Sequence, residues 1–170
     1  MTFRMLNFNI RPVAADDKDW VGKFIAERWG GDFVIAHEVI YYPRKLAGFV
    51  AEQEAEKVGL VTYHLVEHSC EIVTIDSTRS NQGVGTALIE AVRTMAQKAG
   101  CTRLWLVTTN DNIHALRFYQ KRGFELVAVH RNAVTRSRRQ KPSIPLNGEN
   151  GIPIRDEIEL ELQSACRKKI

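Results

Sequence analysis

The sequence predicts an α/β (α+β) domain, in which helices flank a mixed, mostly antiparallel sheet of six or seven strands. The central observation is a run rich in β-branched residues, 70–77, that leads through a glycine-containing loop into a helical apolar periodicity over 84–99. Short strand patterns separated by turn residues lie on both sides of this unit. At 170 residues we expect a single domain over 1–170, with its core at about 9–162.

The strands follow from short alternating or β-branched patterns between turn residues. Pro12 places the first strand at a sheet edge or ends it, and Pro43 breaks whatever 39–42 forms. In the last strand three apolar residues alternate with three glutamates, which predicts a half-buried strand. The strands that we expect are 9–13, 33–35, 49–52, 58–66, 71–77, 103–108, 125–130 and 154–162.

Three helices follow from capping residues and apolar spacing. Asp16 and Asp17 carry N-cap chemistry for a helix that ends at Gly30. A second, over 84–99, has apolar residues every three or four positions and is followed by glycine, the residue that favours a helix C-terminus. A third is capped within 110–112, buries one face and ends at Gly123.

Composition excludes several classes of protein. No apolar run approaches the roughly 18–20 residues that span a bilayer, and the first residues do not form a signal peptide. Cys70, Cys101 and Cys166 are too few and too scattered for a disulfide framework or a zinc site, so we expect reduced thiols in a cytoplasmic protein and no metal. The net charge of +4 suits an anionic ligand or nucleic acid equally well.

The loop before the second helix offers an anion site. The first helical N–H groups lack intrahelical partners, and the helix dipole adds partial positive charge at the same end. Without side chains at Gly83 and Gly85, a pyrophosphate could approach that backbone. A glycine that serves only to turn the chain is an equally open interpretation.

Two motifs in this region resemble the GNAT family, the acetyl-CoA-dependent N-acetyltransferases. Gly83 and Gly85 fit the glycines of the acyl-CoA motif Gln/Arg-x-x-Gly-x-Gly/Ala, whereas Ser80 stands where the motif has Gln or Arg. The second motif is Asn112-x-x-Ala115-x-x-Phe118-Tyr119-x-Lys121-x-Gly123-Phe124. Together the two motifs cover about 70–129, and the flanks fit the fold without a motif.

The resemblance implies a sheet whose central strands splay apart, with the pantetheine arm of acetyl-CoA in the gap. It implies that the backbone of the strand 71–77 holds pantetheine and that the loop after it and the start of the helix 84–99 hold the pyrophosphate. It also implies that the third helix lines the path of the coenzyme. The coenzyme-binding residues are, in that order, Ile75, Asp76 and Ser77; Gln82, Gly83, Val84, Gly85 and Thr86; and Asn112, Ala115 and Phe118.

The resemblance also implies catalytic residues. Tyr119 matches the family tyrosine that can protonate the leaving thiolate, and a core tyrosine with a satisfied hydroxyl is the alternative. Glu71 is the first candidate for the general base, because some members carry a catalytic glutamate at a similar place. A solvent-facing Glu71 is equally open. Asp76 and the row Glu157, Glu159 and Glu161 are weaker alternatives, since an acidic strand face is usually solvated.

We therefore expect an N-acetyltransferase that moves acetyl from acetyl-CoA to a primary amine in a ternary complex. The acceptor, a small molecule or a peptide, is not identified; His37, Tyr41 and Tyr42 are candidate pocket residues, or else serve packing. A non-catalytic CoA-binding sensor or a nucleic-acid-associated module on the same fold is the rival function. GNAT domains often dimerise, so a homodimer is also expected, without an identified interface.

A long insertion at 131–154 separates the last two strands. Its first half is basic with no acid, and it could contact the 3′-phosphate of coenzyme A, an acidic acceptor or nucleic acid, or be simply solvated. It lacks the interleaved aromatic residues that favour single-stranded nucleic acid. We do not expect disorder, because four apolar residues offer anchors: Ile144, Leu146, Ile152 and Ile154.

Overall fold

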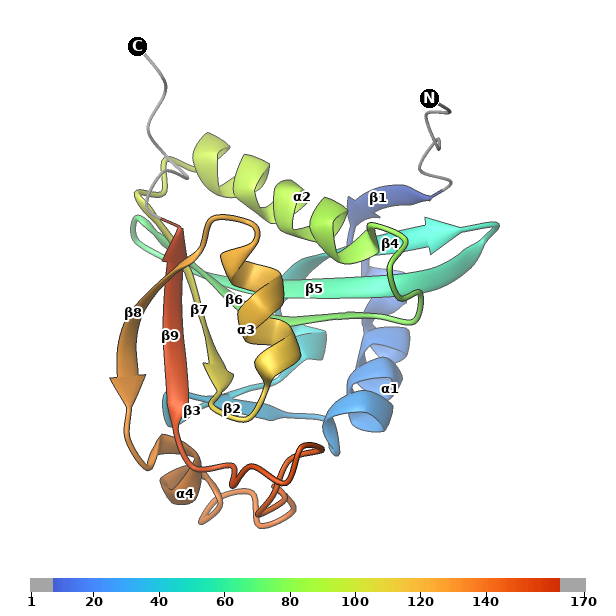
Figure 1. Ribbon diagram of the computed structural model, residues 1–170. Coiled ribbons are helices and arrows are strands. Elements are labelled where there is room, and N and C mark those ends of the chain that lie inside the picture. The colour runs from blue at the N-terminus through green and yellow to red at the C-terminus, as the bar shows by residue number, and fades with distance from the viewer. Residues whose placement is uncertain (1–7, 163–170) are drawn as a thin grey trace.

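A seven-stranded sheet in the order β1-β4-β5-β6-β7-β9-β8 organises the computed structural model, which describes residues 8–162 (Figure 1). All neighbouring strands are antiparallel except β6 and β7. The predicted fold class is therefore confirmed. The strands are β1 (Asn9–Pro12), β4 (Ala47–Gln53), β5 (Glu56–Val66), β6 (Ser69–Ser77), β7 (Arg103–Thr109), β8 (Glu125–His130) and β9 (Glu157–Leu162).

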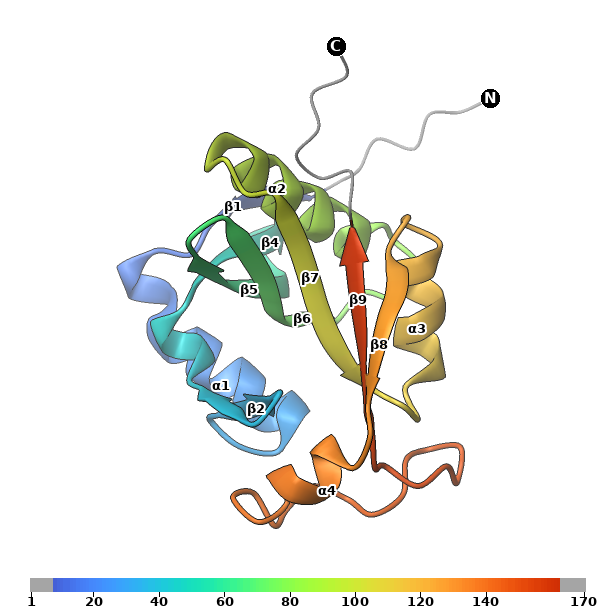
Figure 2. The ribbon, with the colours of Figure 1, turned by 90° about the vertical axis from the view of Figure 1, so that its left-hand side faces the viewer.

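Helices cover the two faces of this sheet separately. On one face α2 (Val84–Lys98) and α3 (Ile113–Gln120) pack their apolar stripes against the strands. On the other face lie α1 (Lys18–Trp29) and the hairpin β2 (Val34–Ala36)–β3 (Val39–Tyr41), with an apolar cluster of their own. Figure 2 shows α3 and the pair α1 and β2 on opposite sides of the sheet. Among the described residues, no helix has the length and hydropathy needed to cross a membrane.

The sheet opens at its centre. β6 and β7 pair only where Ser69–Glu71 meet Arg103–Trp105, and beyond that point β6 stays on β5 while β7 stays on β9. The register between β5 and β6 shifts after Ile72, so that Val73 is an extra residue on β6. This extra residue lies close to the point where β6 and β7 separate. Such a bulge bends a strand, which is how β6 turns away from β7. The splayed central strands are thus confirmed.

Asp17 does not cap α1 as predicted. Its carboxylate accepts a hydrogen bond from the N–H of Ala14 at 2.8 Å and pairs with Arg11 and Lys57 at 2.6 and 2.7 Å. The predicted strand from 154 also begins later, at Glu157. Two 3₁₀ turns, Ala15–Asp17 and Pro43–Lys45, complete the first half of the chain. The predicted reduced thiol of Cys166 lies outside the described residues.

The insertion has defined structure and begins with a short helix, α4 (Ala133–Ser137). Of the four predicted apolar anchors, the Leu146 side chain is 72% exposed, so this prediction was wrong for Leu146, whereas Ile144, Ile152 and Ile154 are partly buried. Arg138 donates to the carbonyls of Ile144 and Ile154, and Lys141 is buried with its ammonium on the carbonyls of Trp29 and Phe33. The solvated interpretation of the basic half is therefore wrong for these two residues, which hold the insertion together and against the end of α1.

Candidate active site

A cavity of about 900 Å³ occupies the gap between β6 and β7. Its wall includes residues of α1, β2, β6, the loop before α2, the first turn of α2, β7 and α3. All but one of the predicted coenzyme-binding residues line it, and so does Tyr119. These are Ile75, Asp76, Ser77, Gly83, Val84, Gly85, Thr86, Asn112, Ala115 and Phe118. Gln82 is exposed on the loop and Glu71 is buried behind the wall, so neither lines the cavity.

The start of α2 presents backbone N–H groups to this cavity. Gly83 is the N-cap residue, with a left-handed φ of 82°, and it has no side chain that could cap the helix. The carbonyl of Gly83 accepts from the N–H of Ala87, and within the described residues nothing accepts from the three N–H groups before it. The positive end of the helix dipole and the unsatisfied N–H donors therefore lie together in this part of the cavity wall.

Gly85 is needed for a reason that the sequence did not show. A Cβ at this position would lie 3.0 and 3.1 Å from two atoms of the Phe118 ring, closer than ordinary van der Waals contact. The absence of a side chain therefore lets α3 pack its aromatic residue directly against the first turn of α2. The glycine shapes the cavity through Phe118, besides keeping the backbone accessible.

Arg122 is a wall residue that the sequence analysis missed. Its guanidinium donates to the Thr86 hydroxyl at 3.0 and 2.6 Å and to the Phe118 carbonyl at 2.8 Å, and it lies 3.6 Å from the centre of the Phe118 ring. Burial lowers the pKa of this arginine. Arg122 lines the cavity near the start of α2, and within the described residues no carboxylate pairs with its charge. Its position inside the second motif was the available signal.

Asp76 is engaged elsewhere. Its carboxylate meets the guanidinium of Arg28 with two contacts of 2.7 Å, which tie the end of α1 to β6. The pair lies in the cavity wall, where it contributes one positive and one negative charge.

Tyr119 lies in the wall on the α3 side and is 7% exposed. Its ring packs edge-on against Phe118 and Phe124, with centroids 5.3 and 5.5 Å away. Burial, and then the charge of Asp76, raise the pKa of the phenol, so it carries its proton at neutral pH. No hydrogen-bond partner for the hydroxyl occurs among residues 8–162. Asn112 fixes this helix as predicted, accepting from the N–H of Ala115 at 3.1 Å.

Glu71 is buried, so the solvent-facing alternative is wrong. One carboxylate oxygen lies 2.8 Å from Nε2 of His37 and the other accepts from the Tyr41 hydroxyl at 2.8 Å. The hydrogen bond to Glu71 is the main cause that raises the pKa of His37, while burial and then Glu71 raise that of Tyr41. Both carboxylate oxygens of Glu71 therefore have partners in the hairpin. The role of Glu71 as the base stays a prediction.

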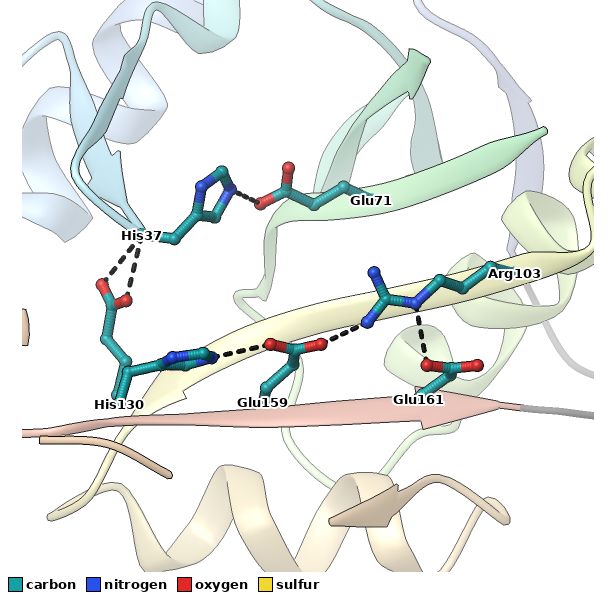
Figure 3. A network of polar contacts seen from close by, with 7 residues as sticks. His37, Glu71, Arg103, His130, Glu159 and Glu161 are labelled. Atoms are coloured by element: carbon teal, nitrogen blue, oxygen red, sulfur yellow. Dashed lines mark hydrogen bonds and ion pairs between the residues drawn. The ribbon is translucent and has the colours of Figure 1, made fainter. Parts of the chain in front are cut away.

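Of the three glutamates in the row of β9, Glu157 is the one that lies in the cavity wall. It is 3% exposed, and both oxygens accept from the backbone N–H of His37, at 3.1 and 3.0 Å. A solvated strand face is thus wrong for this residue. Farther along β9, Glu159 lies between His130 and Arg103, and Glu161 also pairs with Arg103 (Figure 3). The alternation of β9 could not reveal that the hairpin covers its first glutamate.

Comparison with known proteins agrees with this architecture. The model of the acetyltransferase (GNAT) family matches residues 16–124. The uncharacterized protein YxbD of Bacillus subtilis is 43% identical over 158 residues, which cover 91% of this chain and 99% of that protein.

Two solved structures show the same fold. A GNAT family acetyltransferase from Elizabethkingia anophelis with acetyl-CoA bound has a TM-score of 0.66 at 21% identity, over 92% of this chain and 98% of that chain. The IAA acetyltransferase of Bacillus cereus has a TM-score of 0.70 at 21% identity, over 92% and 99% of the two chains. Because the family model covers more than half of its length, the chain belongs to the GNAT family of acetyltransferases.

Proposed function

We propose that this protein transfers an acetyl group from acetyl-CoA to a primary amine, directly, within a ternary complex. The observation that carries the proposal is the cavity between β6 and β7, which joins the uncapped start of α2 to the buried phenol of Tyr119. The similar structure with acetyl-CoA bound supports the choice of cosubstrate.

The coenzyme would bind along three parts of the cavity wall. From Ile75 to Ser77, the edge of β6 that faces the gap offers backbone groups to the pantetheine arm, as a neighbouring strand would. The N–H groups of 83–86 and the guanidinium of Arg122 would hold the diphosphate. Asn112, Ala115 and Phe118 would line the path beyond the thioester. Gln82, exposed beside the loop, would contribute through its backbone.

Tyr119 would protonate the leaving thiolate. Its pKa is raised, its ring is held by Phe118 and Phe124, and the residue lines the cavity with no hydrogen-bond partner for its hydroxyl among residues 8–162. As the amine nitrogen bonds to the carbonyl carbon, the C–S bond breaks and the thiolate takes the phenolic proton. A neutral phenol in a buried site is suited to that transfer.

The acceptor would be a small-molecule or peptide amine that enters beside the β2–β3 hairpin. Val34, Ile35 and Ala36 of β2 lie in the cavity wall, whereas His37 and Tyr41 lie behind it and hold the hairpin through Glu71. A homodimer remains part of the proposal, to be checked by light scattering.

Incubation of the protein with acetyl-CoA and a panel of primary amines tests the reaction, with thiol release as the readout and calorimetry with CoA as a parallel measurement. We expect CoA binding, and thiol release that depends on the amine. Tight CoA binding without turnover on any amine would favour the rival, a non-catalytic CoA-binding module. Release that is independent of amine would indicate thioester hydrolysis instead.

A further inference from the structure

We propose that Glu157 accepts the proton of the acceptor ammonium, and that the site therefore selects a primary amine with no carboxylate beside its nitrogen. This inference rests on the proposed acetyl transfer and names the base and the acceptor class for it. It is carried by the position of Glu157 in the cavity wall, on the opposite face of the sheet from Tyr119.

Tyr119 and Glu157 lie on opposite faces of the sheet, so the proposed acid and the proposed base approach the cavity from different sides. Tyr119 belongs to the apolar cluster of α2 and α3, on the face where the coenzyme would bind. Glu157 contacts the β2–β3 turn, and its cross-strand partner on β7 is Thr109. Val107, two residues earlier on β7 and so on the same face as Thr109, packs with the cluster of α1 and the hairpin. Both residues line the same cavity, which lies between the splayed strands. An amine that enters from the hairpin face therefore meets Glu157 on its way to a thioester that lies toward Tyr119.

Glu157 is held ready for this role. Its two oxygens share one N–H donor, that of His37, so each keeps capacity to accept another hydrogen bond. Two other carboxylates on this side already have partners: Glu71 is held by His37 and Tyr41, and Glu159 by Arg103 and His130. Glu157 is thus a buried carboxylate of this face, in the cavity wall, that can receive an ammonium.

The surroundings of Glu157 raise the pKa of its carboxyl group. Burial is the largest effect and raises the pKa of the carboxyl; the nearby Glu38 of the hairpin turn raises it further. The amide of His37 and the positive charges of His37 and His130, which face it from the turn and from β8, act in the opposite direction. A carboxylate with a raised pKa is a stronger proton acceptor near neutral pH than an exposed glutamate.

The surrounding wall indicates the acceptor. Val34 and Ala36 are buried apolar residues of β2 in the wall, and Val107 adds apolar surface from β7. Glu149, from the insertion, adds another carboxylate to this wall. An alkyl or arylalkyl ammonium could place its apolar part against these apolar residues and its charge beside the carboxylates. An α-amino acid would instead bring its own carboxylate next to Glu157 in a partly desolvated site.

The proton balance is complete. The ammonium gives one proton to Glu157, which passes it to solvent. The neutral amine then forms the C–N bond, the C–S bond breaks, and the thiolate takes the proton of Tyr119. A second proton from nitrogen returns to Tyr119 through water. The products are the amide, the free thiol of CoA and one proton.

Glu157→Gln tests the base, because the amide oxygen of Gln can still accept from the N–H of His37 and so retain the hairpin. With phenethylamine we expect kcat/KM to fall about a hundredfold or more. The acid limb of the wild-type pH profile, where kcat/KM falls as Glu157 becomes protonated, should also disappear. The affinity for CoA should stay the same. Glu161→Gln is the matched control on the same strand and face, outside the cavity, and should retain wild-type rates.

Turnover of Glu157→Gln within twofold of wild type would overturn the role of Glu157 and leave the proposed acetyl transfer standing. Should this variant fail to fold, the test is the affinity of the wild-type CoA complex for two ligands, measured by calorimetry. Phenethylamine should then bind more tightly than phenethyl alcohol, its uncharged counterpart, with an advantage that is lost at acid pH; equal affinities would overturn the proposal. If this advantage is present but no amine is acetylated, the ammonium site stands and the proposed reaction fails.

The acceptor class has its own comparison. Phenylalanine differs from phenethylamine by the carboxylate beside its nitrogen, and we expect its kcat/KM to be lower by about tenfold or more, since like charges repel strongly at low dielectric. Equal kcat/KM values for the two amines would overturn this selection.

Discussion

Nε2 of His37 lies 2.8 Å from Oε1 of the buried Glu71, and the contact joins segments 34 residues apart in the chain. Glu71 is the last residue of β6 that pairs with β7, so this contact anchors the β2–β3 hairpin at the apex of the open sheet. His37 and Glu38 form the two-residue turn of that hairpin with left-handed φ values of 42° and 67°, which non-glycine residues rarely adopt. The contact therefore holds a costly turn in place beside the cavity (Figure 3).

This ion pair predicts a pH dependence of stability. The hydrogen bond to Glu71 raises the pKa of His37 in the folded protein. Its stabilisation is then fully present below the unfolded pKa of about 6.5, and it is lost as the pH rises through the folded pKa. In a double-mutant cycle of His37→Asn and Glu71→Gln, measured by urea unfolding, we expect the coupling free energy to decrease between about pH 5.5 and pH 8.5. A coupling of equal size at both ends of this range would contradict a charged pair.

Tyr119→Phe should lower kcat about a hundredfold while CoA affinity and stability change little. The substitution removes the proposed proton donor but leaves the ring between Phe118 and Phe124, and no group in the described part of the chain loses a hydrogen bond to the hydroxyl. Steady-state kinetics with saturating acetyl-CoA measures the effect. Tyr63→Phe, a partly buried tyrosine that packs on Phe49 away from the cavity, is the control. Unchanged kcat in Tyr119→Phe would discard this residue as the acid.

Gly85→Ala should weaken CoA binding about tenfold and destabilise the protein by about 1–3 kcal/mol, because its Cβ would press on the Phe118 ring at 3.0 Å. Calorimetry with CoA and thermal unfolding measure the two effects. Gly22→Ala is the matched control inside α1, where the nearest atom to the new Cβ is Arg44 Cδ at 3.9 Å. That variant should be stabilised by about 0.5–1 kcal/mol with unchanged CoA affinity. Similar CoA binding by both variants would mean that Phe118 does not shape the coenzyme site.

Arg122→Met should weaken CoA binding about tenfold and make the remaining affinity less sensitive to salt. The substitution removes a positive charge beside the start of α2 that no carboxylate of residues 8–162 pairs with. Affinities measured at low and high ionic strength check this. Arg117→Met removes the same charge from the exposed side of α3 and should change neither the affinity nor its salt dependence by much. A Kd that is equal in the two variants would place the diphosphate away from Arg122.

Much of the fold was predictable because its signals are local. The apolar stripe of α2, the cap at Asn112 and the alternation of β9 each depend on residues a few positions apart, and all three elements are present, although β9 begins three residues later than predicted. Asp17 was mistaken for a helix cap because its partners, Arg11 and Lys57, reach it from outside the local segment. Leu146 was mistaken for an anchor because hydrogen bonds of Arg138 to backbone carbonyls, which no pattern reveals, order the insertion.

The sequence by itself determined the order of the elements, since strand alternation, apolar stripes and caps act through nearby residues. It also carried the family resemblance, which implied ten coenzyme-binding residues that line the cavity. Only the tertiary structure decided which charged groups matter in the cavity: Glu157 within its wall, Glu71 behind it and Arg122 against Thr86. The physical reason is that the burial of a carboxylate, and hence its pKa, depends on which distant segment covers it. In β9 the glutamates repeat with the same spacing, and the hairpin turn covers Glu157.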